Sequence, residues 1–273
     1  FHGGKCVSRL ARSFAVCPDN RDRRALWRKN GFYVGGCSFP GRQDWSNDFG
    51  FAHPPGLSEQ ATRELDADLA ARLGLQVMRI DLPCSWPAED APIDFKLADA
   101  CANTFVTRGF KLVFQVGFTP NWAIGSRYKD KNPRWLYPPR EEPFRKLIRA
   151  CAERYAQHTE FFEIRNEPDN EDFWRGTPEE YINCVRWASE EIHKVAPKVP
   201  VAAGGYTMMK PEETGTIVRG VRDYTDVVTY HFHGTLDRMP DMFAAIRAIC
   251  AAAGYKKPTF VNTEMGYAAW RLD

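Results

Sequence analysis

Two glutamates follow apolar segments that lie far apart in the sequence. Glu167 comes after Phe-Phe-Glu-Ile-Arg-Asn and precedes a proline, and Glu264 comes after Phe-Val-Asn-Thr. Two carboxyl groups in one site can cleave a glycosidic bond, because one protonates the leaving oxygen while the other meets the cationic sugar carbon. This chemistry requires a fold that brings Glu167 and Glu264 together.

Short segments rich in β-branched and aromatic residues alternate with helical segments along the chain, which predicts a parallel sheet. Seven strands are predicted, at 32–38, 76–81, 111–117, 161–166, 199–204, 227–233 and 259–264. In a barrel, catalytic groups gather where the carboxyl ends of the strands meet. Glu167 and Glu264 follow or end the fourth and seventh strands, so both would face one mouth.

Apolar residues at helical spacing predict helices between these strands. The first is closed by Gly74, which suits the left-handed position after a helix. Thr177 and Glu180 form a capping box at the start of another. The predicted helices cover 59–73, 94–109, 143–155, 177–192 and 242–250.

A chain of 273 residues fits one large barrel better than two average domains. We assign 32–273 to an α/β fold, the (β/α)8 TIM barrel, incomplete at its C-terminal end because seven strands are recognisable. The eighth either lies beyond Asp273 in a longer parent, which we favour, or comes from 13–17. An open doubly wound sheet is the alternative, but its usual glycine-rich dinucleotide turn does not follow the first strand.

Charge is concentrated in a basic N-terminal arm, residues 1–31, with eight Lys or Arg and two acids. We interpret this arm as a solvated leader or the remnant of a preceding region. The net charge of +2 for the whole chain gives no reason to expect nucleic acid or an anionic membrane as a partner. No apolar run reaches the roughly 20 residues that span a bilayer, and no signal peptide is recognised. The chain starts at Phe1, which indicates processing or a longer parent.

Eight cysteines include no Cys-x-x-Cys pair, which excludes a zinc ribbon. Four of them fall on apolar helix faces, where a free thiol packs as a small hydrophobe: Cys101, Cys151, Cys184 and Cys250. A disulfide between Cys6 and Cys17 is left open.

The segment around Glu167 resembles a known family. Asn166-Glu167-Pro168 after an apolar strand, with Glu264 ending a later one, resembles the retaining glycoside hydrolases of the (β/α)8-barrel clan A. The run 162–168, with Phe173-Trp174 and 176–181 after it, is most similar to family 39, the β-xylosidases and α-iduronidases. The cellulase-like family 5 comes next.

This resemblance implies a retaining glycosidase that acts on a β-linked sugar chain or glycoside, with no metal and no organic cofactor. It makes Glu167 the general acid/base and Glu264 the nucleophile, and it has Asn166 bind the sugar 2-hydroxyl. Arg79 matches the clan's strand-two arginine, which could supply positive charge, and Asp81 could orient it. A structural Arg79–Asp81 pair is the alternative. The resemblance also favours a secreted or cell-envelope location.

Two histidines end the sixth predicted strand. His231 and His233 share one face of that strand. In the family this place often reads His-x-Tyr, with the tyrosine touching the nucleophile, so His233 stands where that tyrosine would be. The alternatives are a metal-binding pair and two rim histidines without a direct role.

Tryptophans follow the predicted strands, where flat aromatic faces could bind sugar rings. They are Trp45, Trp86, Trp122, Trp135, Trp174 and Trp270. We expect Trp122 and Trp174 to contact substrate. Glu163 is interpreted as a buried structural carboxylate and Glu171 as a solvated loop residue. The rival functions are a non-catalytic carbohydrate-binding barrel or inactive fragment and, third, a metal-dependent barrel hydrolase.

Overall fold

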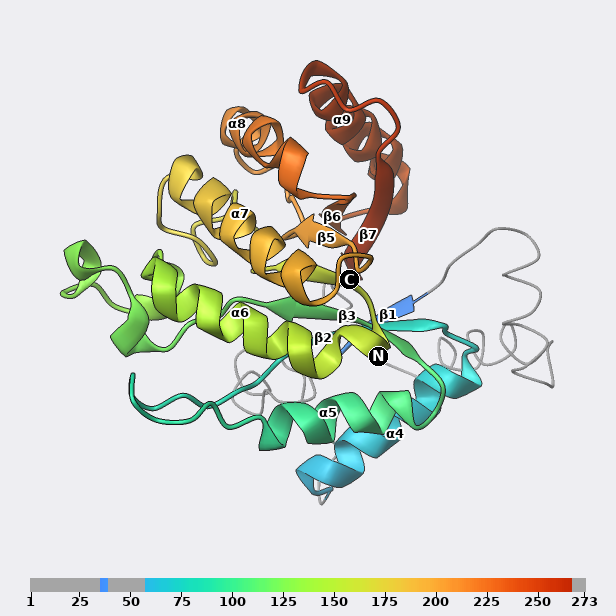
Figure 1. Cartoon of the computed structure of the whole chain (residues 1–273). Coiled ribbons are helices and arrows are strands. Elements are labelled where there is room, and N and C mark those ends of the chain that lie inside the picture. The colour runs from blue at the N-terminus through green and yellow to red at the C-terminus, as the bar shows by residue number, and fades with distance from the viewer. Residues whose placement is uncertain (1–34, 39–56, 267–273) are drawn as a thin grey trace.

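The computed structural model describes residues 35–38 and 57–266. Within these ranges seven strands form one parallel sheet in sequence order (Figure 1). They are β1 (Gly35–Ser38), β2 (Val77–Asp81), β3 (Lys111–Val116), β4 (Thr159–Ile164), β5 (Val201–Ala203), β6 (Val227–His233) and β7 (Thr259–Gly266). β1 lies beside β7, so the sheet curls into a nearly closed barrel. The predicted TIM-barrel fold is confirmed, with all seven predicted strands present in the described residues.

Six α-helices follow the strands in the described part of the chain: α4 (Glu59–Arg72), α5 (Lys96–Val106), α6 (Glu141–Tyr155), α7 (Pro178–Val195), α8 (Pro211–Val221) and α9 (Met239–Ala252). Short 3-10 turns occupy Asn121–Ala123, Ser126–Tyr128, Arg134–Leu136, Ala156–His158, Arg222–Tyr224 and Leu236–Arg238. The predicted capping box is present in α7, where the Glu180 amide donates to Thr177 and the Glu180 carboxylate accepts from the Thr177 amide. α8 is the helix that the sequence pattern does not predict.

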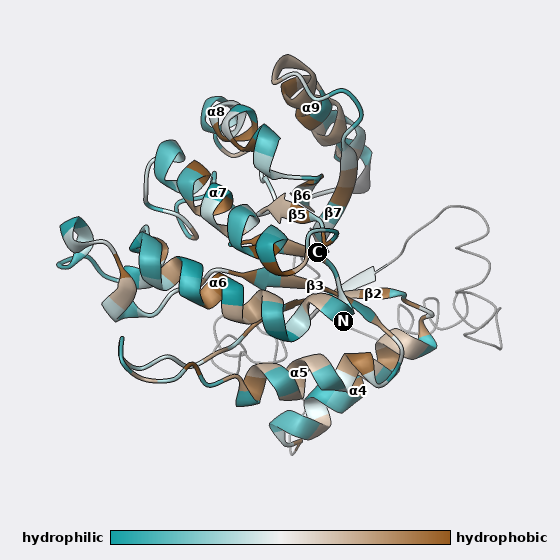
Figure 2. Ribbon diagram, viewed as in Figure 1, coloured by the Kyte–Doolittle hydropathy of each residue, from teal (hydrophilic) through white to brown (hydrophobic). Residues whose placement is uncertain are grey.

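The two faces of the strands have different neighbours. One face meets α4 to α9 in the main hydrophobic core, which includes the four predicted core cysteines at no more than 2% exposure. The opposite face forms a small apolar layer inside the barrel, made of Val77, Val113, Phe161, Ala202, Val227 and Val261. Figure 2 shows hydrophilic and hydrophobic residues alternating along the outer helices α6 and α7. Such alternation is typical of amphipathic helices, which bury one face, just as the period-two strands separate their two faces.

Several sequence predictions fall on residues that the structure does not describe. They are the basic arm 1–31, the Cys6–Cys17 pair, the substitute strand 13–17, Trp45 and Trp270. In the described ranges, none of the helices combines the length and the apolar character that a bilayer crossing requires.

Candidate active site

On the inner face of the barrel, polar side chains occupy the next inward positions after the small apolar layer, toward the carboxyl ends of the strands. Arg79, Gln115 and Glu163 each stand two residues after a member of the inner apolar layer, and each is at most 3% exposed. Their strands are adjacent in the sheet, with Arg79 beside Val113 and Gln115 beside Glu163 in register. Because side chains two apart point the same way, the same pattern that builds the apolar floor places these polar groups above it.

Arg79 is the centre of this polar layer. Its Nε donates to Glu163 Oε2 at 2.5 Å, its Nη1 to Glu264 Oε1 at 2.6 Å, and its Nη2 to Asn166 Oδ1 at 2.8 Å. Burial opposes the charge of Arg79, but the neighbouring carboxylates outweigh burial and raise its pKa. The guanidinium therefore stays charged and holds three groups from β4, the following loop and β7 in fixed positions.

A register shift in β7 directs two consecutive side chains into this layer. Tyr230 pairs with Asn262 and His231 pairs with Glu264, so Thr263 is an extra residue opposite β6. Thr263 Oγ1 donates to Glu163 Oε1 at 2.8 Å, while Glu264 accepts from Arg79. A regular strand would point these neighbours to opposite faces, and the bulge removes that restriction.

Two residues with positive φ, Arg165 and Glu167 itself, direct the Glu167 side chain toward the barrel mouth. Arg165 has φ of 62° and Glu167 has φ of 39°, values that are uncommon outside glycine. The buried Arg165 side chain holds this turn, because it donates to Gly117 O at 3.1 Å and Trp135 O at 2.7 Å. Glu167 Oε2 then accepts from Asn170 Nδ2 at 2.7 Å. The chain after β4 therefore leaves the strand and returns Glu167 to the barrel mouth.

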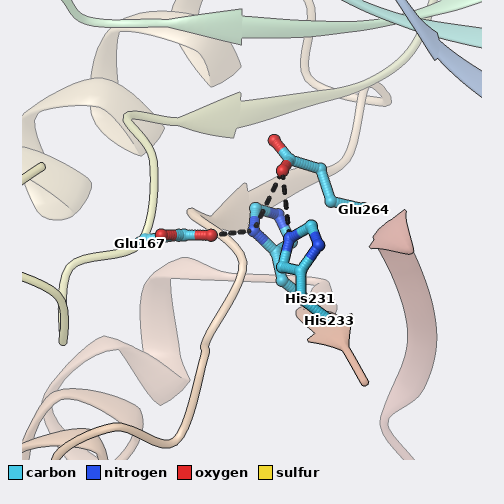
Figure 3. Close-up of side chains that lie close together, drawn as sticks. All are labelled: Glu167, His231, His233 and Glu264. Carbon is cyan, nitrogen blue, oxygen red and sulfur yellow. Dashed lines mark hydrogen bonds and ion pairs between the residues drawn. The ribbon is translucent and has the colours of Figure 1, made fainter. Parts of the chain in front are cut away.

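Glu167 and Glu264 meet around the two histidines of β6, as Figure 3 shows. His231 Nδ1 lies 2.7 Å from Glu167 Oε1 and 3.7 Å from Glu264 Oε2, and His233 Nε2 lies 3.5 Å from Glu264 Oε2. One ligand-type atom from each of the four residues lies within 4.8 Å of those of the others. Carboxyl groups of retaining glycosidases are about 5 to 5.5 Å apart, whereas those of inverting enzymes are about 6.5 to 9.5 Å apart. One carboxylate oxygen of Glu167 lies within 4.8 Å of one of Glu264, a proximity compatible with the shorter spacing.

The charges around Glu264 keep its carboxylate ionised. Burial would raise its pKa, but the hydrogen bond from His233 and the charges of His231 and Arg79 lower it to about 2. The pKa of His233 is raised, chiefly by its hydrogen bond to Glu264 and against the effect of burial. An ionised Glu264 is suited to act as a nucleophile.

The structure brings together six of the eight residues singled out for the site: Arg79, Asn166, Glu167, His231, His233 and Glu264. Glu163 is buried, as predicted, and it accepts from Arg79 in the place expected for Asp81. Glu171 is exposed and pairs with Lys210 at 2.7 Å, as expected of a loop residue.

Gln115, which sequence reasoning missed, donates to Asn166 Oδ1 at 2.7 Å. The inward position of Gln115 could have been inferred from the sequence, because it lies two residues after Val113 on β3.

The two chosen tryptophans have packing contacts. Trp174 is 4% exposed, its indole N–H donates to Thr177 O at 3.2 Å, and the Arg165 guanidinium lies 4.8 Å from its ring centre. This burial leaves no free ring face, so it does not support the predicted contact of Trp174 with substrate. Trp122 is half-buried and donates to Trp86 O at 2.8 Å. Its contact with substrate stays a prediction.

Comparisons with known proteins give similarity at the level of fold. No protein-family model and no curated protein matches the sequence. A glucosidase from Croceicoccus marinus superimposes with a TM-score of 0.63 at 12% identity, covering 86% of this chain and 52% of that one. A family 39 glycoside hydrolase from Bacteroides cellulosilyticus WH2 gives 0.58 at 17% identity, covering 86% and 49%. The endoglucanase Cel5A from Thermotoga maritima gives 0.56 at 17% identity, covering 86% and 78%.

A family 5 mannosidase from Rhizomucor miehei also superimposes, with a TM-score of 0.58 at 15% identity, covering 88% of this chain and 71% of that one. Families 39 and 5 are the two families that the motif around Glu167 resembles. At such identities the likeness establishes a shared barrel fold. The chain spans about half the length of the glucosidase and of the family 39 enzyme.

Proposed function

We propose that this chain is a retaining glycoside hydrolase that cleaves O-glycosidic bonds in a β-linked oligosaccharide, polysaccharide or glycoside. The observation that carries the proposal is that one carboxylate oxygen of Glu167 lies within 4.8 Å of one of Glu264 at the mouth of the barrel. Such proximity supports the retaining mechanism, in which the two carboxyl groups stand closer together than in inverting enzymes.

The reaction proceeds by double displacement. Glu264 attacks the anomeric carbon while Glu167 gives its proton to the departing oxygen, so the glycosidic bond breaks as a glycosyl ester forms. Glu167, now a carboxylate, removes a proton from water, and that water breaks the ester and releases the sugar with its original configuration. Glu264 and the proton on Glu167 are both restored.

Surrounding groups support these two roles. Arg79 holds Glu264 Oε1 and leaves Oε2 toward the mouth side of the cluster, where His231 and His233 lie. Asn170 and His231 fix both oxygens of Glu167. Asn166 is held through its Oδ1 by Arg79 and Gln115, which leaves its amide N–H groups for a sugar hydroxyl.

The test is a panel of aryl glycosides and polysaccharides assayed with single variants. Glu264→Ala should abolish turnover, and added azide should restore release of a product with inverted configuration. Glu167→Gln should lower turnover about 10² to 10⁴-fold, the usual contribution of general acid catalysis. Glu171→Gln is the matched control, because Glu171 is an exposed glutamate of the same loop and should keep wild-type rates.

Two outcomes would contradict the proposal. One is wild-type turnover in both single glutamate variants. The other is sugar binding by calorimetry with no release from any glycoside of the panel, which would favour a non-catalytic carbohydrate-binding barrel.

A further inference from the structure

Each of the two site carboxylates has one inner and one outer oxygen. The inner oxygens are Glu167 Oε1 and Glu264 Oε2, which face the histidines at 2.7 to 3.7 Å. The outer oxygens are held elsewhere, Glu167 Oε2 by Asn170 at 2.7 Å and Glu264 Oε1 by Arg79 at 2.6 Å. Outer partners that fix the ligand groups are the usual surroundings of metal sites in proteins.

The four inner atoms form a mixed nitrogen and oxygen set. His231 Nδ1 and His233 Nε2 supply two imidazole nitrogens, and the glutamates supply two oxygens, all within 4.8 Å of one another. Imidazole with carboxylate suits zinc and neighbouring transition metals, whereas magnesium and calcium take oxygen ligands almost exclusively. Three of these side chains are buried or half-buried, so an ion at their centre would be largely shielded from water.

We propose that Glu167, His231, His233 and Glu264, the Glu–His cluster, bind one transition-metal dication of the Zn²⁺ type, and that the bound ion inhibits the enzyme. Metal binding follows from the side chains alone. Inhibition rests on the proposed function, because the ion would occupy both the acid/base and the nucleophile.

Binding requires the four atoms to reach an even spacing, so His231 Nδ1 and Glu167 Oε1 must move apart from 2.7 Å while the wider pairs, up to 4.8 Å, must close. Four ligands at about 2.0 to 2.2 Å from zinc are separated from one another by about 3.3 Å. The pairs that Glu264 Oε2 makes with His231 and His233, at 3.7 and 3.5 Å, are already close to this value. The His233 side chain is 54% exposed at the end of β6, so it can move toward the ion without disturbing the core. The proton that His231 Nδ1 shares with Glu167 would leave to solvent as the metal takes its place.

The direct test uses Co²⁺ as a spectroscopic probe of the full chain, followed by calorimetry with Zn²⁺. Co²⁺ should produce the visible absorption of a low-coordinate nitrogen and oxygen site with one ion per chain, and Zn²⁺ should displace it. Mg²⁺ and Ca²⁺ should do neither. These readouts need no substrate, so they remain valid if the chain proves to hydrolyse nothing.

The variants separate this site from metal binding elsewhere. His233→Ala should weaken Zn²⁺ binding at least 100-fold, and Asn170→Ala, which frees only an outer oxygen, should weaken it about 10-fold. His158→Ala is the control and should bind like wild type, since His158 directly precedes β4 at the opposite end of the barrel. Because the His233 side chain is 54% exposed, its variant should still unfold cooperatively within a few degrees of wild type, which checks that the fold is kept.

Unchanged Zn²⁺ affinity in His233→Ala, or a Co²⁺ spectrum of an ion bound only by water, would overturn the site. Wherever hydrolysis is measurable, Zn²⁺ should inhibit it and a chelator should restore it. Stimulation by Zn²⁺ would overturn the inhibitory role and favour metal-assisted hydrolysis instead.

Discussion

Arg79 is the residue on which the charge balance of the site depends. It is 3% exposed and contacts the carboxylates of both Glu163 and Glu264. Removing the guanidinium would leave both carboxylates without their cation, and a buried charge without a partner is strongly destabilising.

Arg79→Leu should therefore lower the free energy of unfolding by about 3 to 5 kcal/mol, measured by urea denaturation. The matched control is Arg108→Leu. Arg108 forms a partly exposed pair with Asp68 at 2.7 Å, and such pairs contribute about 0 to 1 kcal/mol. Equal losses in the two variants would show that the Arg79 network contributes no more than a surface pair.

Gly205 provides the space for His231. A Cβ atom at this position would lie 2.1 Å from the Nε2 and Cδ2 atoms of His231, far inside contact distance. The ring would have to leave, and with it the hydrogen bond from Nδ1 to Glu167.

We expect Gly205→Ala to lower kcat/KM about 100-fold on any glycoside that the wild type cleaves, since small displacements in an active site have effects of this size. Gly215→Ala is the control, because a Cβ there meets nothing within 4 Å and α8 should gain about 0.5 to 1 kcal/mol of stability. Wild-type kinetics in Gly205→Ala would show that His231 is not needed where it stands.

At the level of elements, Asp169 joins two loops of the barrel mouth. It is 1% exposed and accepts from the Thr207 amide at 3.1 Å, the Met208 amide at 2.8 Å and the Thr214 hydroxyl at 2.8 Å. The loop that carries Glu167 is thereby tied to the loop after β5 and to the first turn of α8.

Asp169→Ala should destabilise the protein by about 2 kcal/mol or more, because it leaves the half-buried Thr207 and Met208 amides without this acceptor at about 1 to 3 kcal/mol each. Hydrogen exchange should accelerate at the Met208 amide before the amides of β4 respond. The prediction would be refuted by unchanged exchange at Met208.

α5 and α6 are linked by a carboxylate that should affect acid stability. Asp99 accepts from Arg154 Nε at 2.6 Å and from the Tyr155 hydroxyl at 2.9 Å. The hydrogen bond from Arg154 lowers the pKa of Asp99 below its usual value of 3.8. A carboxyl whose folded pKa is depressed stabilises the fold above its unfolded pKa, and this contribution is lost as pH falls through the folded pKa.

Asp99→Asn should thus cost up to about 1 kcal/mol at neutral pH, and the difference from wild type should shrink below pH of about 4 and vanish at lower pH. Urea unfolding at several pH values measures this. A difference that stays constant with pH would show that the loss is one of packing or hydrogen bonding and not of charge.

The elements could be predicted from sequence to different extents. Strand and helix periodicity is local, so the inward position of Arg79 and the helix that starts at Thr177 follow from a few neighbours. α8 escapes the pattern because Gly215 and Gly220, poor helix formers, interrupt it. The shift at Thr263 is invisible in sequence, since it depends on pairing with β6.

The candidate site could be predicted because its motif follows the end of a strand. The contacts of the residues around it, such as Glu163 and Trp174, could not. Asp81 and Glu163 both occupy inward strand positions, and only the distances decide that Glu163 contacts Arg79. Trp174 follows a strand as a sugar-binding residue would, yet it packs on Arg165 and Tyr181. Whether a loop side chain faces the mouth or covers the core depends on residues distant in sequence.

At the scale of the whole molecule, the barrel closes where its first and last described strands approach each other. Arg79 of β2 donates through Nη1 to Glu264 of β7. The same Nη1 lies 3.5 Å from the Sγ of Cys37 in β1. Glu264 therefore joins a site whose other members come from β2, the loop after β4 and β6. Such long-range closure is the slow part of forming a barrel, because the intervening chain must be ordered first.

The Arg79–Glu163 pair has a consequence for biosynthesis. Both residues lie in β2 to β4, the part of the described sheet that leaves the ribosome well before β7. Once β2 to β4 have been synthesised, Glu163 is available to neutralise the Arg79 guanidinium. This cation therefore has a carboxylate partner before Glu264 is added to the chain.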